Sequence, residues 1–139
     1  MSDANEKSNQ PIALIVDDEA TIRLLVSQAL ELSGFRAEEA ADGPSALIAM
    51  GRLTPDVILL DARLPGMDGF RLCQAIRQLP NGKNVPVLMM TGMNDAQLLP
   101  WAKEVGATDI VGKPLKLLDL GQRLHALVKG RPTGSGGGA

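Results

Sequence analysis

The sequence predicts an α/β fold: one doubly wound domain in which helices cover both faces of a parallel sheet. Short runs of consecutive apolar residues recur along the chain, as expected for strands that are buried on both faces. Segments with apolar residues at helical spacing lie between these runs. Strands that alternate with helices form parallel sheets, so the two patterns together predict this class of fold.

Five segments are expected to form the strands. Three are strongly apolar and two are weaker, and each weaker one follows a glycine placed to end the preceding helix, Gly34 or Gly106. In chain order the five lie at residues 12–16, near 35–39, at 57–60, at 85–90 and near 108–111.

Five helices are expected to connect and follow these strands. The first spans about residues 20–33 and carries more apolar residues than one core-facing stripe needs, so some should face solvent or a partner. The second opens at residues 43–45 with a proline in its first turn, and the third follows Asp68 and Gly69. The last, at about residues 117–128, has the clearest apolar stripe.

The fourth helix is unusual because Pro100 lies where its interior should be. Proline cannot donate an amide hydrogen bond and its ring clashes with the preceding turn. The helix is therefore expected either to start late, with Pro100 in its first turn, or to be kinked.

These elements leave few topologies. Right-handed crossovers favour the strand order 2-1-3-4-5 with helices on both faces, a flavodoxin-like (βα)5 arrangement. The first and third strands are then neighbours whose following loops diverge. That divergence makes a crevice at the carboxyl ends of the strands, where ligands bind in such sheets.

Composition fits one domain in a reducing compartment. The chain has 139 residues, 45% of them hydrophobic, and a net charge of −2, which gives no bulk attraction to nucleic acid or to an anionic membrane. Cys73 is the single cysteine, and the polar N-terminus has no apolar signal segment. We therefore expect a cytoplasmic protein with no direct nucleic-acid or membrane partner.

Residues 1–10 are predicted to be a disordered segment, 11–130 the folded domain, and 131–139 a flexible linker or expression remnant.

Polar residues follow four of the predicted strands. They are Asp17 and Asp18 after the first, Asp61 after the third, Thr91 after the fourth and Lys113 near the end of the fifth. Three aspartates gathered at one edge repel each other unless they take up a proton or hold a cation, and oxygen ligands of this kind suit Mg²⁺. A carboxylate nucleophile with a metal, a hydroxyl and a lysine is a set suited to phosphoryl transfer.

The chain here resembles the response-regulator receiver domains of bacterial two-component signalling, over essentially residues 11–130. The resemblance rests on the segments Val16–Glu19, Asp61–Gly69, Met90–Gly92, Gly106–Asp109 and Lys113–Pro114. It implies that Asp61 is the phosphoacceptor, that Asp18 binds Mg²⁺ directly and that Asp17 acts largely through metal-bound water.

The resemblance also implies roles for residues around these acids. The backbone carbonyl of Arg63 would complete the protein ligands of the metal. Thr91 and Lys113 would each bind a phosphoryl oxygen, and the bond between Lys113 and Pro114 would be cis. Receivers usually carry an aromatic residue at the position of Ile110, so the transmission of the signal is expected to be altered or to rely on the fourth helix.

The function implied is that of a signalling switch in a two-component pathway or phosphorelay rather than a metabolic enzyme. Phosphorylation would bias the surface made by the fourth helix, fifth strand and fifth helix. A sensor histidine kinase or histidine phosphotransfer protein would supply the phosphoryl group. The output would be a C-terminal domain, for which a weak pattern at residues 120–124 suggests a cyclic-di-GMP enzyme, or a separate effector.

Two other functions stay open. A magnesium-dependent phosphatase with an aspartate nucleophile, of the haloacid dehalogenase kind, needs a second aspartate two positions on, where this chain has Arg63. A receiver-like binding module that works without phosphorylation would not need the full acidic set, Thr91 and Lys113.

Overall fold

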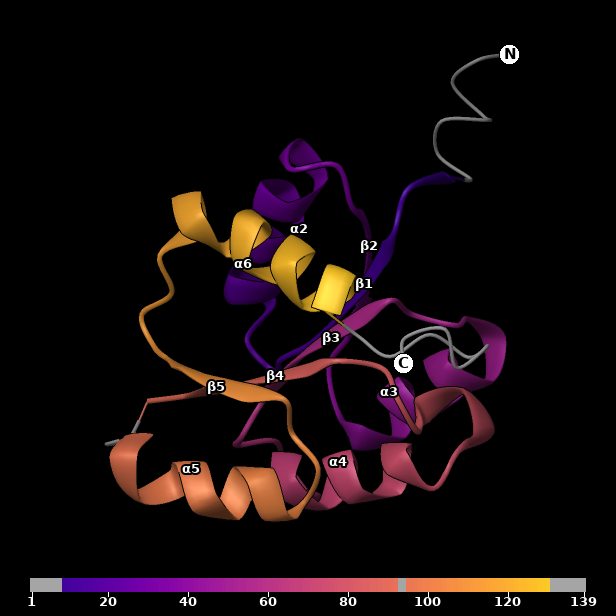
Figure 1. Cartoon of the computed structure of the whole chain (residues 1–139), viewed down its shortest axis with the longest axis vertical. Helices are drawn as coiled ribbons and strands as arrows, with labels where there is room; N and C mark the ends of the chain where they lie inside the picture. Colours follow the sequence, from indigo (N-terminus) through magenta and orange to yellow (C-terminus); the bar gives the residue numbers. More distant parts are fainter. Residues whose placement is uncertain (1–8, 93–94, 131–139) are drawn as a thin grey trace.

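The computed structural model describes residues 9–92 and 95–130, which form a parallel five-stranded sheet with the order β2-β1-β3-β4-β5 (Figure 1). The predicted fold class and strand order are confirmed. The strands differ from the predicted segments only at their ends: β1 is Ile12–Val16, β2 Arg36–Ala40, β3 Val57–Asp61, β4 Val87–Thr91 and β5 Asp109–Gly112. The terminal segments predicted to be disordered fall mostly on residues 1–8 and 131–139, outside the described residues.

Helices cover both faces of this sheet (Figure 1). They are α2 Ala20–Leu32, α3 Gly43–Arg52, α4 Gly69–Arg77, α5 Asp95–Glu104 and α6 Leu117–Gly130, with a short 3-10 turn at Pro80–Gly82. Helices α2 and α6 pack on one face, and α3, α4 and α5 on the other. Alternate residues of the central strands point into these two cores: Leu14 and Ile58 face α3 and α4, whereas Ala13 and Leu59 face α2 and α6.

Aspartates cap the N-termini of α3 and α4, near the carboxyl ends of the strands. The side chain of Asp42 accepts a hydrogen bond from the Ser45 amide at 2.8 Å, and Asp68 accepts one from the Arg71 amide at 2.8 Å. Each carboxylate satisfies an amide that has no partner within its own helix. These caps fix where α3 and α4 begin.

Close contact between α2 and α6 depends on Gly121. A Cβ atom added at Gly121 would lie 2.1 Å from the hydroxyl of Ser33, just past the end of α2. The absence of a side chain therefore lets the two helices of this layer approach each other.

Helix α5 does not start late. It begins by Asp95, so Pro100 lies in its interior rather than its first turn, and that alternative of the prediction is wrong. Interior proline leaves one carbonyl of the preceding turn without its usual amide donor. The helix is held against the sheet by the buried Ala102, and by Val105 directly after its last residue.

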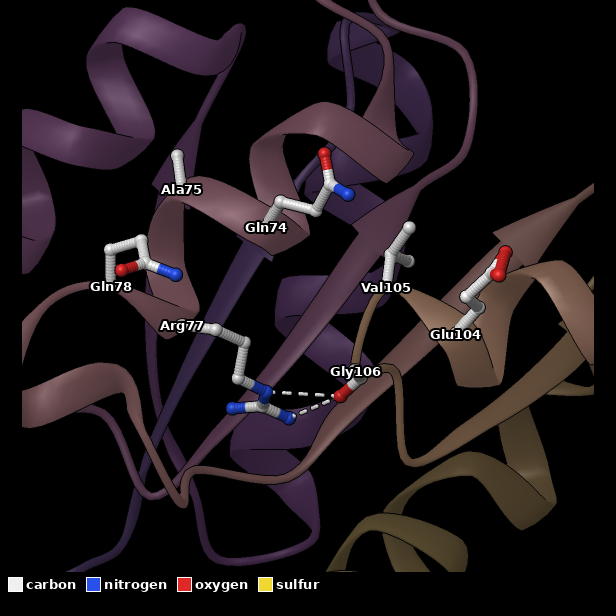
Figure 2. A pocket seen from close by; sticks show the side chains of 7 residues that line it. All are labelled: Gln74, Ala75, Arg77, Gln78, Glu104, Val105 and Gly106. Atoms are coloured by element: carbon white, nitrogen blue, oxygen red, sulfur yellow. Dashed lines mark hydrogen bonds between the residues drawn. The ribbon is translucent and has the colours of Figure 1, made fainter.

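Arg77 connects two loops at the amino ends of the strands, opposite the carboxyl ends where the predicted site residues lie. Its guanidinium donates to the carbonyl of Gly106 from both Nε and Nη2, at 3.0 and 2.7 Å (Figure 2), and to those of Gly82 and Val85 from Nη1. Burial lowers the pKa of this guanidinium, which nevertheless keeps its charge at any physiological pH. Arg77 thus fixes the end of α4 to the loop that enters β5.

In the described part of the chain, no helix combines the length and the apolar character needed to cross a bilayer.

Candidate functional site

The carboxyl ends of β1, β3, β4 and β5 bring the predicted residues to one edge of the sheet. Asp17 directly follows β1, Asp61 ends β3, Thr91 ends β4 and Lys113 directly follows β5. Neighbouring strands align these ends, since Leu60 pairs with Met89 and Thr91 with Gly112. This edge includes the switch point between β1 and β3, where open α/β sheets bind ligands.

Asp17 is fully buried and fixed by its neighbours. Its amide donates to the carbonyl of Ala40 at 3.1 Å, which extends the pairing of β1 with β2. Its carboxylate accepts from the Glu19 amide on Oδ1, at 2.9 Å, and from Lys113 on Oδ2, at 3.1 Å. Asp18, the next residue, is exposed and presents its carboxylate to solvent at the mouth of the site.

Lys113 bridges the two buried acids. Its Nζ lies 3.0 Å from Oδ2 of Asp61 and 3.1 Å from Oδ2 of Asp17, and 3.7 Å from the carboxylate of Glu19. The other carboxylate oxygen of Asp61 accepts the Arg63 amide at 3.0 Å. Such charge-assisted hydrogen bonds are short and strong, so they hold the Asp61 side chain in one orientation.

The three aspartates are close enough to share a cation. One carboxylate oxygen from each of Asp17, Asp18 and Asp61 lies within 4.8 Å of the others. Hard oxygen ligands from few carboxylates suit Mg²⁺, which keeps several waters. Lys113 supplies one positive charge against three acids, which leaves the cluster net negative. The residues present therefore fit the divalent cation expected from the sequence.

Burial governs the protonation of Asp61. It raises the pKa of the Asp61 carboxyl, although the Arg63 amide and Lys113 act in the opposite direction, and the charge of Asp17 adds to the rise. An ion pair alone would lower this pKa, so desolvation outweighs it. For Lys113, burial disfavours the charged form, but hydrogen bonds to Asp61 and Asp17 raise the net pKa above the usual lysine value.

Asp61→Asn is expected to stabilise the metal-free protein at neutral pH. A carboxyl whose pKa is raised by folding binds its proton more tightly in the folded state, so stability falls as pH rises from the ordinary value of 3.8 through the raised one. Asparagine removes that penalty. Urea unfolding of wild type and variant in chelator should show a gain at pH 7 that shrinks as pH falls. Asp68→Asn, which removes an exposed charge, should show no such gain, and an equal gain in both variants would contradict the assignment.

The other predicted residues surround the acids. Thr91 is buried, and its carbonyl accepts the Lys113 amide at 2.8 Å. The Arg63 side chain is exposed, and Ile110 is buried under α5. The bond from Lys113 to Pro114 is cis, as predicted. Whether the Arg63 carbonyl binds a metal stays a prediction.

A polar cleft opens over this arrangement. It is lined by Asp18, Glu19, Asp61, Arg63, Gly92 and Lys113. Sequence reasoning assigned no role to Glu19, which forms the third ion pair of Lys113, although its place beside Asp18 was a usable signal. It also assigned none to Arg23, which donates to the Asp17 carbonyl.

The family model described as "Response regulator receiver domain" matches residues 13–125. The chain belongs to this family. Among solved structures, this receiver resembles the chemotaxis protein CheY4 of Vibrio cholerae, with 35% identity and a TM-score of 0.81 over 85% of this chain and 98% of that one. It also resembles the receiver of the sensor histidine kinase PA1611 from Pseudomonas aeruginosa PAO1, at 28% identity, a TM-score of 0.76 and coverage of 86% and 98%; that crystal has a magnesium ion in the active site cleft.

Curated relatives of this receiver are longer proteins. The DNA-binding dual master transcriptional regulator RpaA of Synechocystis is 36% identical over 119 residues, which are 86% of this chain and 49% of RpaA. Response regulator PleD of Caulobacter vibrioides is 37% identical over 117 residues, 84% of this chain and 26% of PleD. The chain thus spans half or less of the length of these two relatives.

Proposed function

We propose that this receiver accepts a phosphoryl group on Asp61, with Mg²⁺ bound by Asp17, Asp18, Asp61 and the Arg63 carbonyl. The observation that carries the proposal is the contact of Lys113 Nζ with Asp61 at 3.0 Å, inside a cluster of three carboxylates. Together they supply a nucleophile, a cation site and a fixed positive charge. The magnesium ion in the related PA1611 receiver supports the choice of metal.

The chemistry follows from the donors at hand. A carboxylate oxygen of Asp61 forms a bond to phosphorus, the bond from phosphorus to a histidine nitrogen of the donor breaks, and the imidazole leaves with the electron pair. Mg²⁺ would supply charge neutralisation for the phosphoryl oxygens. Lys113 would bind one oxygen and the Thr91 hydroxyl another. Burial of Asp61 limits access of hydrolytic water to the product.

The alternative functions are less well supported. No acid stands at Arg63, two positions after Asp61, to protonate a leaving group as the phosphatase would require. A module that works without phosphorylation would have no use for three acids and a lysine held at the switch point. We therefore assign the chain a role as a signalling switch.

Incubation with acetyl phosphate and Mg²⁺, followed by intact mass measurement, tests the proposal. A labile phosphoryl adduct is expected on the wild type and not on Asp61→Asn. Asp56→Asn is the matched control, because Asp56 lies at the other end of β3 and bonds the Ile12 amide. The adduct should disappear when a chelator replaces Mg²⁺. Wild type without an adduct, in the presence of a working receiver as standard, would favour the binding module.

We further propose that the signal leaves through α5, β5 and α6. Ile110 on β5 is aliphatic and buried, so it offers no aromatic ring to swing between two positions. An aromatic contact exists elsewhere: Trp101 of α5 stacks on Phe70 of α4 with ring centroids 4.4 Å apart and planes at 9°. Phe70 follows Gly69, which packs against the backbone of Asp61. The stack therefore joins α5 to the start of α4, which packs against Asp61 at the end of β3.

Phe70→Leu is expected to reduce the response of α5 while leaving phosphorylation intact. Leucine keeps the apolar contact but loses the stacking face. With a beryllofluoride phosphoryl mimic and Mg²⁺, wild type should show a change in Trp101 fluorescence and shifted α5 and β5 amide signals, and the variant smaller ones. Phe35→Leu removes a ring in the other core, where it stacks on His125 of α6, and is the control for the α5 and β5 signals, which it should leave unchanged. Unchanged α5 and β5 signals in wild type would contradict this route.

Partners follow from the proposed chemistry. A sensor histidine kinase or histidine phosphotransfer protein would donate the phosphoryl group in the cytoplasm. RpaA is described as DNA-binding, and both RpaA and PleD extend beyond the matched region. We propose that this receiver likewise controls an output domain or a separate effector, a cyclic-di-GMP enzyme being one candidate.

A further inference from the structure

Arg23 of α2 contacts the backbone of the loop that follows β1 and carries Asp17, Asp18 and Glu19, here called the acidic loop. Its Nη1 donates to the backbone carbonyl of Asp17 at 2.7 Å, and its Nε lies 3.2 Å from Oε1 of Glu39 on β2. The Arg23 side chain is 18% exposed and that of Glu39 is 41% exposed, so the bond to the Asp17 carbonyl is partly buried whereas the ion pair with Glu39 is open to water. A short bond from a cation to this carbonyl fixes the peptide plane between Asp17 and Asp18.

Glu39 is held in turn by a buried hydroxyl. Ser27 of α2, 7% exposed, donates to Oε2 of Glu39 at 2.9 Å. Both oxygens of Glu39 are therefore engaged, one by Arg23 and one by Ser27. The orientation of the guanidinium is set from two sides, by β2 and by the acidic loop.

Asp17 has little freedom of its own. Its amide donates to Ala40, and its carboxylate accepts from the Glu19 amide and from Lys113. The bond from Arg23 to its carbonyl is the further contact that sets the direction of the chain into Asp18. Asp18 is exposed, and its side chain forms no hydrogen bond with the described residues. Its position relative to Asp17 and Asp61 then depends on the peptide plane that Arg23 holds.

We infer that Arg23, oriented by Glu39 and Ser27, is a positioning residue that sets the affinity and the size selectivity of the cation site. The inference rests on the proposed function, since it takes the three aspartates as the Mg²⁺ site. Partners of this kind, which hold ligands without touching the metal, change metal affinity by roughly 10–100-fold when removed.

Charge and position predict opposite results for Arg23→Met. Loss of a positive charge near three carboxylates would, by Coulomb's law alone, make the site bind cations more tightly. Loss of a fixed peptide plane would make it bind them more weakly. Methionine keeps much of the apolar stem and adds no charge, so the sign of the change separates the two effects.

Mg²⁺ titration by calorimetry at constant ionic strength is the test, on the full chain. We expect Arg23→Met to bind Mg²⁺ about tenfold more weakly than wild type. Arg36→Met is the matched control. Among the described residues Arg36 forms an ion pair only with Glu38 on the same strand, at the other end of the sheet, and its loss should change affinity less than about twofold. Unchanged or tighter binding by Arg23→Met overturns the inference.

Selectivity gives a readout that general destabilisation would not move. Mg²⁺ requires near-ideal octahedral ligands, whereas Ca²⁺ accepts varied geometry. A loosened Asp18 should therefore reduce Mg²⁺ affinity more than Ca²⁺ affinity, and the ratio of the two should fall in Arg23→Met. Equal losses for both ions would overturn the positioning role.

Arg23→Lys keeps the charge but replaces the planar fork, in which Nη1 and Nε make the two contacts separately, by a single nitrogen with a different reach. Its Mg²⁺ affinity should lie between those of wild type and Arg23→Met. If the methionine variant does not fold in chelator, the lysine variant tests the positioning role in its place. A lysine variant with wild-type affinity and selectivity contradicts the inference. Wild type that binds no Mg²⁺ would instead defeat the proposed function itself, and the inference with it.

Discussion

Lys113→Met is expected to destabilise the metal-free protein by about 3 kcal/mol, because it leaves buried acids without their cation. Asp17 is fully buried and Asp61 is 5% exposed, and Lys113 is the side chain that bridges them. Their mutual repulsion, together with that of Asp18, would then act without compensation. Urea unfolding in chelator at neutral pH measures the loss.

Mg²⁺ should restore much of this stability. A divalent cation in the acidic cluster replaces the missing charge and binds only the folded state, so it stabilises by mass action. The variant should therefore gain more from Mg²⁺ than wild type does. Lys116→Met, an exposed neighbour, should change stability by less than about 0.5 kcal/mol and show no such rescue. A Lys113 variant as stable as wild type would mean that solvent screens the acids.

Gly69→Ala is expected to cost about 3 kcal/mol of stability and to abolish phosphorylation, because its side chain has no space. An added Cβ would lie 2.2 Å from the backbone carbonyl oxygen of Asp61 and 2.8 Å from Cα of Ala62. Backbone atoms cannot rotate away as a side chain can. Relief of the clash must move α4 away from the end of β3, which displaces Asp61 from Lys113.

Gly51→Ala is the matched control, since it also lies in a helix but has no atom within 4 Å of the added Cβ. It should leave phosphorylation intact and stabilise the protein by up to about 1 kcal/mol. Acetyl phosphate labelling and urea unfolding of both variants provide the comparison. A Gly69 variant that labels at the wild-type rate would show that the loop shifts without disturbing Asp61.

The sequence was sufficient to predict the edge of the sheet where the site lies. Consecutive apolar residues identified strands buried on both faces, and parallel strands place their carboxyl ends together, so Asp17, Asp61 and Lys113 had to converge. The convergence follows from topology and does not require any side-chain geometry.

Side-chain contacts across elements could not be predicted in the same way. The bond from Arg23 to the Asp17 carbonyl depends on rotamers and on a loop conformation, and the Phe70–Trp101 stack joins helices that are distant in sequence. For α5, Pro100 left open a late start or a kink, but Leu98 and Leu99 before the proline pack against the core, and the helix starts by Asp95. These contacts depend on tertiary packing, which has no periodic signature in the sequence.

Borohydride trapping tests the central claim most directly. Hydride reduces an aspartyl phosphate to homoserine and releases phosphate, so it marks the acceptor permanently. After labelling with acetyl phosphate and Mg²⁺, peptide mapping by mass spectrometry should find homoserine at position 61, and Lys113→Met should give much less. Homoserine at position 17 or 18 instead, or at no position in a labelled protein, would contradict Asp61 as the phosphoacceptor.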